Sequence, residues 1–256
     1  MARVCLLVVA WHVVPGTPLL IGANRDERFD RPTTAFTVLR QAQPRVLGGR
    51  DERAGGTWLA VNEHGVVAGL TNQPLGDARD PSRRSRGELP LALAGHRHAA
   101  AAVEALLEDH RPLEYNGSWL LVGDRHALIF VDFTGLVEPE PIMLPPGLHV
   151  LENRSLGAPS PKVDRVRAAL SGLGGAATDP AAAVRLALSD HTAPEATDSP
   201  TGATCIHLDE FGTRSSCIVQ VPEAAGTRPR ILVADGPPCV TPFVDVSECW
   251  ERPSPR

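Results

Sequence analysis

The sequence is poor in lysine, cysteine and aromatic residues, and these shortages exclude several classes of protein. Lys162 is the only lysine, and aromatic residues make up 4% of the chain. Acidic residues outnumber basic ones by 30 to 25, so the formal net charge is −5 and the basic surface of a nucleic-acid-binding protein is not expected. Five cysteines in 256 residues are too few for a disulfide framework. We therefore expect a protein of the reducing cytoplasm whose partner is a small molecule.

Long hydrophobic runs and nucleotide-binding motifs are also missing. The apolar run at residues 4–14 follows Arg3, but it is too short to span a bilayer and no small-x-small cleavage site follows it. We read this run as a buried strand and expect no membrane span. The glycine-rich residues 172–175 follow a helical pattern and lack the Lys-Ser/Thr pair of a P-loop, and no Rossmann fingerprint is present.

What is present is an ordinary globular composition, with 43% hydrophobic and 21% charged residues. No linker divides the chain, so we predict a single domain over residues 1–256, with a Pro-rich, extended tail at 236–256. Hydrophobic alternation and turn signals predict strands in hairpin pairs, with helices clustered between them. The predicted strands are 3–14 with 19–23, 57–61 with 66–71, 118–122, 127–133, 148–151, 204–208 with 215–221, and 231–234. The predicted helices lie within 87–107, at 162–170 and at 180–188. Paired strands favour an α+β layered fold over a parallel βαβ sheet.

The first predicted hairpin places a thiol beside a carboxylate. Reflecting the hairpin about the middle of its turn, between Pro15 and Gly16, brings Cys5 opposite Asp26. A carboxylate is costly to bury unless it is hydrogen-bonded. A cationic α-amino group on Cys5 itself would suit Asp26 and, once neutral, could accept the thiol proton. The alternative is a buried cysteine with an exposed aspartate beyond the strand end.

Residues 24–27 read Asn-Arg-Asp-Glu, and further short runs follow in order along most of the chain. This pattern resembles the NRDE family, whose members are similar to the transport and Golgi organisation protein 2 of animals. The other runs that carry the resemblance are Arg31-Pro32, Gly55-Gly56-Thr57-Trp58-Leu59, Leu70-Thr71-Asn72, Arg86-Gly87-Glu88-Leu89, Tyr115-Asn116-Gly117, Asn153 and Gly212-Thr213-Arg214-Ser215-Ser216.

The resemblance implies a four-layered αββα fold of the N-terminal-nucleophile hydrolase type, with two mainly antiparallel sheets between helices. It implies Cys5 as the nucleophile, Asp26 as the carboxylate that holds its α-amino group and Asn72 as an oxyanion-hole amide. Asn153 would be a second active-site amide, and Arg214 would support the thiolate.

Four further residues are assigned to substrate binding. Two of them, Asn24 and Arg25, belong to the Asn-Arg-Asp-Glu run. The others are Gly55 and Gly56, which would let the backbone approach a ligand. Reflecting the second hairpin about position 63.5 brings Gly55 opposite Asn72.

The start of the chain departs from the family pattern. Relatives usually open Met-Cys, so that loss of Met exposes the nucleophile, whereas Cys5 here follows Met-Ala-Arg-Val. Either Val4 is the true start, encoded by GTG, or the four residues are removed by cleavage. A third interpretation is that the protein is not an enzyme and its fold serves binding.

Two functional hypotheses follow from these observations. The first is a cysteine-nucleophile hydrolase that cleaves a non-peptide amide bond of a small molecule through an acyl-enzyme at Cys5, with no cofactor. The second, which the family resemblance implies, is a non-catalytic carrier of haem or another hydrophobic cofactor. We expect no metal site, because Cys205 and His207 share a strand face but no C-x-x-C or H-E-x-x-H motif accompanies them. The sequence does not indicate an oligomeric state.

Overall fold

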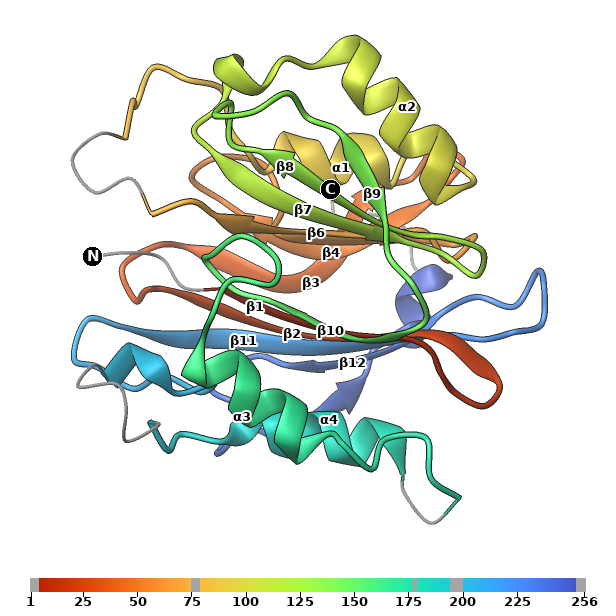
Figure 1. The fold of residues 1–256 in the computed structure, drawn as a ribbon, viewed down its shortest axis with the longest axis vertical. Helices are drawn as coiled ribbons and strands as arrows, with labels where there is room; N and C mark the ends of the chain where they lie inside the picture. Colours follow the sequence, from red (N-terminus) through yellow and green to blue (C-terminus); the bar gives the residue numbers. More distant parts are fainter. Residues whose placement is uncertain (1–4, 75–78, 177–178, 194–199, 252–256) are drawn as a thin grey trace.

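Two β-sheets stack face to face and helices cover the outer face of each. The computed structural model describes residues 5–74, 79–176, 179–193 and 200–251. Figure 1 shows α1 and α2 above one sheet and α3 and α4 below the other. This is the predicted α+β arrangement of four layers, αββα, and the fold-class prediction is confirmed.

The first sheet contains the N-terminal hairpin near its middle. Its strand order is β10-β1-β2-β11-β12-β13, and every neighbouring pair is antiparallel. Sheets covered on both faces favour apolar side chains at every strand position, which is why the run in β1 is almost continuously apolar. The bounds are β1 (Cys5–Val14), β2 (Thr17–Arg28), β10 (Gly147–Leu151), β11 (Phe211–Val221), β12 (Arg230–Ala234) and β13 (Val244–Asp245).

The second sheet follows the chain order, β3-β4-β5-β6-β7-β8-β9, and is also antiparallel throughout. Three of these strands, β3, β4 and β9, were not predicted. Glycines obscure the pattern of β4, because Gly48 and Gly49 make room for neighbouring groups, including the Trp58 ring, instead of presenting side chains. The bounds are β3 (Thr33–Arg40), β4 (Val46–Asp51), β5 (Leu59–Asn62), β6 (Val67–Asn72), β7 (Ser118–Gly123), β8 (Leu128–Phe133) and β9 (Pro141–Met143).

The helices lie where the periodicity predicted them. The region 87–107 holds α1 (Glu88–Leu93) and α2 (Ala99–Asp109), and the later pair is α3 (Pro161–Ala169) and α4 (Pro180–Ser189). As expected, the Asp179 side chain caps α4 by accepting a hydrogen bond from the amide of Ala181 at 3.0 Å. Ser160 caps α3 in the same way, through the amide of Val163.

Apolar side chains fill three layers of core. Leu7 and Val9 of β1 face the second sheet, whereas Leu6 and Val8 face α3 and α4. A third cluster joins α1 and α2 to the other face of the second sheet. Successive residues of β1 therefore serve two different cores, so the face on which a β1 or β2 side chain lies decides its surroundings.

The register of the first hairpin differs from the prediction by one residue. Val14 pairs with Thr17 as expected, but Trp11 pairs with Leu19, so His12 and Val13 together oppose Pro18. His12 adopts a left-handed conformation with φ 51° at this bulge. The extra residue shifts every later pair, and Cys5 lies opposite Arg25 rather than Asp26.

Two other predictions about strands need correction. In the second hairpin Leu59 pairs with Gly69, so the register again differs by one residue and Gly55 lies outside the strands. Residues 204–208 do not form a strand, because only an isolated bridge joins His207 to Gly212 before β11.

The segment after Gly236 is not an extended tail over its described part, which ends at Glu251. β13 pairs with β12, and a short 3-10 helix, η4 (Ser247–Trp250), carries Trp250 back to the molecule. Trp250 is 4% exposed and belongs to the core between the sheets. The sequence did not predict this packing, because the segment is rich in proline and its few buried side chains are too widely spaced to form a periodic pattern.

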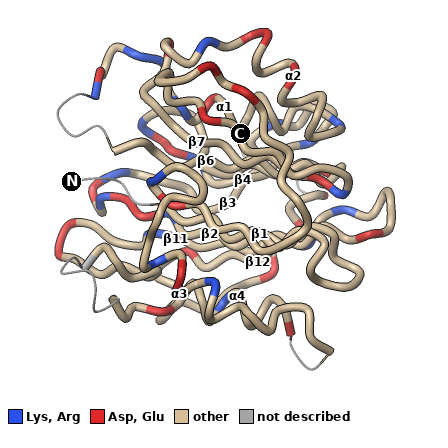
Figure 2. Tube along the Cα trace, in the orientation of Figure 1, with Lys and Arg blue, Asp and Glu red and all other residues tan. Residues whose placement is uncertain are grey.

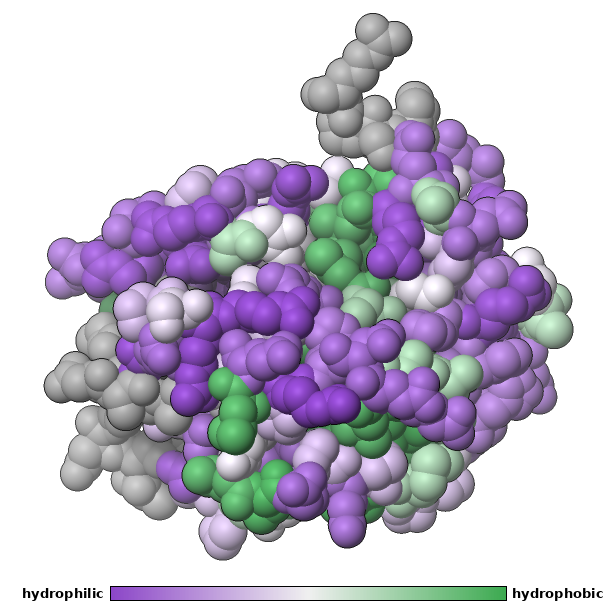
Figure 3. Space-filling view, turned by 90° about the horizontal axis from the view of Figure 1, so that it is seen from above, coloured by the Kyte–Doolittle hydropathy of each residue, from purple (hydrophilic) through white to green (hydrophobic). Residues whose placement is uncertain are grey.

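Charged residues concentrate in loops and at strand ends, whereas the central strands are mainly uncharged (Figure 2). The face seen from above α2 is mostly hydrophilic, with apolar residues in separate patches (Figure 3). No helix in the described part of the chain is long and apolar enough to cross a membrane.

Candidate functional site

A cavity of about 380 Å³ opens where β1, β2, β4 and β6 begin or end near one another. Cys5, Asp26 and Asn72, three of the five predicted catalytic residues, line it. A loop at residues 79–87 forms another part of its wall. The structure therefore brings residues from positions 5 to 116 of the chain to one place.

Cys5 is connected to two asparagines by hydrogen bonds. The backbone N–H of Cys5 donates to Asn153 Oδ1 at 2.6 Å. The Nδ2 of the same asparagine donates to the backbone carbonyl of Asn72 at 2.5 Å. Asn153 thus ties the start of β1 to the end of β6, across the two sheets. This brings the fourth predicted catalytic residue to the site, although it contacts the backbone of Cys5 and not its sulfur.

The Cys5 thiol is buried in a setting that favours its protonated form. Burial, followed by the negative charge of Asp26, raises the pKa of Cys5 to about 11, whereas Arg25 and a hydrogen bond from the Asp26 backbone act to lower it. The thiol therefore needs a base before it can act as a nucleophile near neutral pH.

Asp26 carries a carboxyl group into the helix-covered side of the first sheet. Its Oδ1 accepts a hydrogen bond from Thr213 Oγ1 at 2.6 Å, whereas its buried Oδ2 has no hydrogen-bond partner among the described residues. Burial raises the pKa of Asp26 to about 7, against the opposing effects of Lys162, Thr213 and Arg25. A cation near the unpaired Oδ2 would stabilise the ionised form of Asp26.

Lys162 is a buried residue near the site that the sequence reading did not single out. It lies in the first turn of α3, is 3% exposed, and its Nζ has no hydrogen-bond partner in the described part of the chain. Burial lowers the pKa of Lys162, whereas the charges of Asp26, Glu152 and Cys5 act to raise it. The composition offered one signal for this residue, because a sequence with many arginines and a single lysine is unusual.

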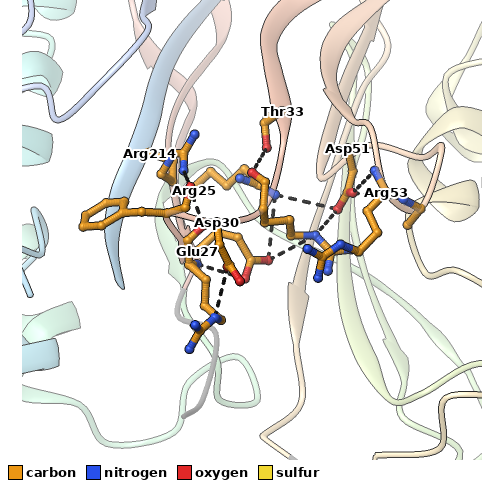
Figure 4. Close-up of polar contacts among 11 residues, drawn as sticks. Arg25, Glu27, Asp30, Thr33, Asp51, Arg53 and Arg214 are labelled. Atoms are coloured by element: carbon orange, nitrogen blue, oxygen red, sulfur yellow. Dashed lines mark hydrogen bonds and ion pairs between the residues drawn. The ribbon is translucent and has the colours of Figure 1, made fainter. Parts of the chain in front are cut away.

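Arg25 lies opposite Cys5 and crosses to the second sheet. Its Nη2 lies 3.8 Å from Glu27 and 3.7 Å from Asp51 of β4, and its guanidinium stacks over the Trp58 ring at 4.4 Å. Figure 4 shows both carboxylates turned toward this group. Its other nitrogen, Nη1, is buried without a partner among the described residues. Arg25, which was predicted to bind substrate, is therefore one of the residues that line the cavity. One nitrogen of its guanidinium has no hydrogen-bond partner among the described residues.

Arg214 is not in the cavity, contrary to the prediction that it would support the thiolate. Thr213 pairs with Asp26 and Ser215 with Arg25, so Arg214 is the extra residue of a bulge in β11. Its guanidinium donates to the Phe29 carbonyl at 2.5 Å and stacks on the Phe29 ring. Figure 4 places it well away from Asp51. The cation whose charge acts to lower the pKa of Cys5 is Arg25.

Two of the other predicted substrate-binding residues lie elsewhere. Asn24 points to the helix side of the first sheet, where its Nδ2 donates to the carbonyls of Leu188 and Thr204, so it joins α4 and the following segment to β2. Gly55 is exposed and does not line the cavity. Gly56 does line it, and a side chain there would collide with the Gly87 backbone at 2.5 Å. The predicted close backbone approach exists at Gly56, and its partner is another loop.

Positive charge dominates the cavity lining. Seven arginines contribute to it, against the three carboxylates of Asp26, Glu27 and Asp51. The arginines are Arg25, Arg31, Arg53, Arg79, Arg83, Arg84 and Arg86. Several are held by neighbours, as Arg84 is by Glu88 and Glu114 at 2.8 Å each. The lining as a whole favours an anionic group.

The described residues also include a group of side chains outside this cavity that could bind a metal ion, although the sequence predicted no metal site. His191, His207 and Cys239 each offer a donor atom within 4.8 Å of the other two. None of the three lines the cavity at Cys5.

Solved structures share the fold. An N-acylethanolamine-hydrolyzing acid amidase ortholog from Caenorhabditis elegans superposes with a TM-score of 0.58 at 14% identity, covering 84% of this chain and 92% of the other. A variant of the conjugated bile acid hydrolase from Clostridium perfringens gives a TM-score of 0.57 at 11% identity, with 94% and 93% coverage. At such identities the likeness establishes the architecture alone.

Sequence relatives are closer. The chain is 31% identical to the Transport and Golgi organization 2 homolog of Mus musculus over 153 residues, which is 57% of this chain and 54% of that protein. It is 31% identical to the Homo sapiens homolog over 154 residues, with 55% and 52% coverage. The match thus spans about half the length of these relatives. The family model described as Transport and Golgi organisation 2 matches residues 4–230, and the chain therefore belongs to this family.

Proposed function

We propose that this chain is a cysteine-nucleophile hydrolase that cleaves an amide bond of a small anionic molecule at Cys5. The observation that supports the proposal is that Cys5, Asp26 and Asn72 line one cavity. The two solved structures named above are described as an amidase and a hydrolase, which agrees with this chemistry.

The reaction requires Cys5 to bear a free α-amino group. The neutral amine accepts the thiol proton, and Sγ attacks the carbonyl carbon to form a tetrahedral intermediate. The Asn72 side chain donates to the developing oxyanion. The C–N bond then breaks, the ammonium returns its proton to the leaving amine, and water hydrolyses the remaining thioester to release the acid and the thiol.

Asp26 and Asn153 would hold the amine in place. Asn153 Oδ1 already accepts the N–H of Cys5 at 2.6 Å, and it would accept one ammonium proton equally well. The orphaned Oδ2 of Asp26 offers a second, charged acceptor. An α-ammonium with an ordinary pKa of about 8 would keep Asp26 ionised near neutral pH.

The arginine-rich lining indicates the charge of the substrate. Arg25 Nη1 is a buried donor without a partner among the described residues, and a substrate carboxylate, sulfonate or phosphate would satisfy it. An amide that bears such a group therefore fits the cavity better than a neutral one. If so, raising the salt concentration will raise KM for a carboxylate-bearing amide and leave KM for its neutral counterpart nearly unchanged.

The free-amine mechanism is tested by the N-terminus of the protein. One form begins at Met1 and the other begins Met-Cys5 with the Met removed, and mass spectrometry verifies both ends. Acylation of Cys5 by a β-lactam or an activated amide should be about 10²–10⁴-fold faster in the trimmed form, because the Met1 form lacks the base. Cys5→Ala is the blank for labelling, and Cys217→Ala controls for the other buried thiols.

Equal acylation rates in the two verified forms would show that the free amine is not the base. Haem titration of the same samples separates the remaining alternative. A carrier protein would show a stoichiometric Soret band and no acylation.

A further inference from the structure

Four sulfur and nitrogen donors from three chain segments meet on the helix side of the first sheet. His191 lies two residues after the end of α4, Cys205 and His207 precede β11, and Cys239 follows β12. The His207 Nε2 lies 3.1 Å from Cys239 Sγ and 3.5 Å from Cys205 Sγ. The two sulfurs lie 3.6 Å apart. The His191 donor lies within 4.8 Å of those of His207 and Cys239.

The three distances among Cys205, His207 and Cys239 are close to those between ligands of one tetrahedral ion, and the His191 donor lies within 4.8 Å of those of His207 and Cys239. Zinc binds sulfur at about 2.3 Å and nitrogen at about 2.0–2.1 Å, so tetrahedral angles place two sulfurs about 3.8 Å apart and a sulfur and a nitrogen about 3.6 Å apart. A disulfide would need its sulfurs at about 2.0 Å. Cys205 and Cys239 are free thiols.

The backbone holds the ligand-bearing segments together independently of any ion. The amides of Thr204 and Cys205 both donate to the Asp190 carbonyl, at 3.2 and 2.9 Å, which fixes the residue before His191. Ser189 Oγ donates to the Pro238 carbonyl at 3.1 Å, beside Cys239. The ligands are therefore positioned in advance, which reduces the entropic cost of binding.

Burial and charge also fit a metal. Cys205 is 1% exposed and Cys239 is partly buried, whereas the two imidazoles are exposed, so an ion can enter from the solvent side. Two thiolates neutralise a divalent cation, and the imidazoles bind in their neutral form. The occupied site would carry no net charge and would need no further counter-ion.

We propose that Cys205, His207, Cys239 and His191 bind one Zn²⁺ ion in a closed tetrahedral site. Cysteine and histidine together are the donor set that zinc prefers over magnesium or calcium. Binding releases the two thiol protons. The ion would tie together the end of α4, the segment before β11 and the loop after β12, a structural role separate from the chemistry at Cys5.

The test uses the reduced full-length chain, freed of metal by a chelator and titrated with Co²⁺ as a coloured substitute for Zn²⁺. We expect tetrahedral d–d absorption and a thiolate charge-transfer band that saturate at one equivalent and disappear when Zn²⁺ is added. Cys239→Ser and His207→Gln should each weaken Co²⁺ binding at least about 100-fold, because loss of a ligand costs more than loss of a supporting contact. Cys217→Ala removes a thiol from the core between the sheets and should bind like the wild type.

Absence of tetrahedral absorption in the folded wild type would overturn the proposal, and so would an unchanged spectrum in Cys239→Ser. Circular dichroism confirms that each variant is folded, and the exposed position of His207 makes its substitution the safer of the two. Cys5 acylation is measured on the same samples. The two proposals can therefore fail separately.

Discussion

The carboxyl group of Asp26 is buried away from solvent. It is 1% exposed and has one hydrogen-bonded oxygen, so ionising it in the folded protein costs more than in the unfolded chain. Its pKa of about 7, compared with an ordinary value of 3.8, expresses this difference. Between these two pH values the folded state binds more protons than the unfolded state, so the Asp26 contribution to the free energy of unfolding falls as pH rises.

The first prediction concerns Asp26→Asn in the form that begins at Met1, where no α-ammonium group lies beside Asp26, and the substitution removes this titration. The stability of the variant relative to wild type should increase between about pH 4 and pH 7 by up to about 4 kcal/mol, and then level off. Urea unfolding at several pH values measures the difference, and comparison with wild type cancels the other groups. The exposed Asp164→Asn should differ from wild type by less than about 0.5 kcal/mol. A pH-independent difference for Asp26→Asn would contradict the assignment.

The second prediction concerns Lys162→Met, also in the form that begins at Met1. At pH 5, where Asp26 is protonated, replacing a buried unpartnered ammonium with an apolar chain should leave stability unchanged or raise it. At pH 8 the same substitution leaves the Asp26 carboxylate without its nearby cation and should cost about 3–5 kcal/mol. The change in the free energy of unfolding caused by Lys162→Met should therefore be more destabilising at pH 8 than at pH 5.

A double-mutant cycle isolates this interaction. In the Asp26→Asn background, Lys162→Met should have nearly the same effect at pH 5 and pH 8, because the charge to which it responds is gone. If the pH dependence persists there, Lys162 interacts chiefly with another group, such as Glu152.

At the scale of elements, two bulges decide which side chains reach the cavity. The bulge at His12 shifts β1 by one residue and sets Cys5 beside Arg25. The bulge at Arg214 lets Thr213 and Ser215 of β11 pair with Asp26 and Arg25 of β2, while the arginine turns away. Because side chains alternate between faces, one inserted residue exchanges the face of everything beyond it.

The packing of α4 on β2 supports the third prediction. Gly22 lies beneath the helix, and a Cβ there would approach Val184 Cγ1 to 2.4 Å and Leu188 Cδ1 to 3.2 Å. Gly22→Ala should therefore push the helix outward and cost about 1–3 kcal/mol, measured by urea unfolding. Gly172→Ala is the matched control, because nothing lies within 4 Å of its added carbon. Equal unfolding midpoints for the two variants would show that α4 can shift without loss.

At the scale of the whole molecule, the C-terminal segment completes the core between the sheets. Trp250 packs into that core, and its Nε1 donates to the Pro229 carbonyl at 2.8 Å. An ion pair joins the same two sheets at the cavity, where Asp51 of β4 lies 3.7 Å from Arg25 of β2, and Asp51 also lies 2.7 Å from Arg31 in the turn after β2. Residues near both ends of the chain thus hold the two sheets together.

The fourth prediction follows from this arrangement. Trp250→Ala should lower the free energy of unfolding by about 3–5 kcal/mol, as expected for a large buried aromatic side chain. Val240→Ala, at a position 77% exposed in the same segment, should change it by less than about 0.5 kcal/mol. Denaturant unfolding monitored by circular dichroism compares them. A Trp250→Ala variant as stable as Val240→Ala would mean that the segment contributes little to the core.

The sequence alone determined the fold class, the helices and most strands, because alternation and 3.6-residue periodicity report which face of an element is buried. The family resemblance also predicted Cys5, Asp26, Asn72 and Asn153 as site residues, and the structure places the first three in the lining of one cavity, with Asn153 bonded to Cys5. The strands that it missed, such as β4, carry glycines whose role is to admit a neighbour's side chain. That role is invisible without the neighbour.

Only the tertiary structure decided the strand register and the contacts between distant segments. A bulge depends on local backbone geometry, so reflection about a turn could not show that Arg25, and not Asp26, lies opposite Cys5. Lys162 lies near Asp26, although more than a hundred residues separate them in the chain. Cys239 lies beside His207, 32 residues away in the chain. No periodic pattern links such positions, because their proximity arises from how whole sheets and helices pack.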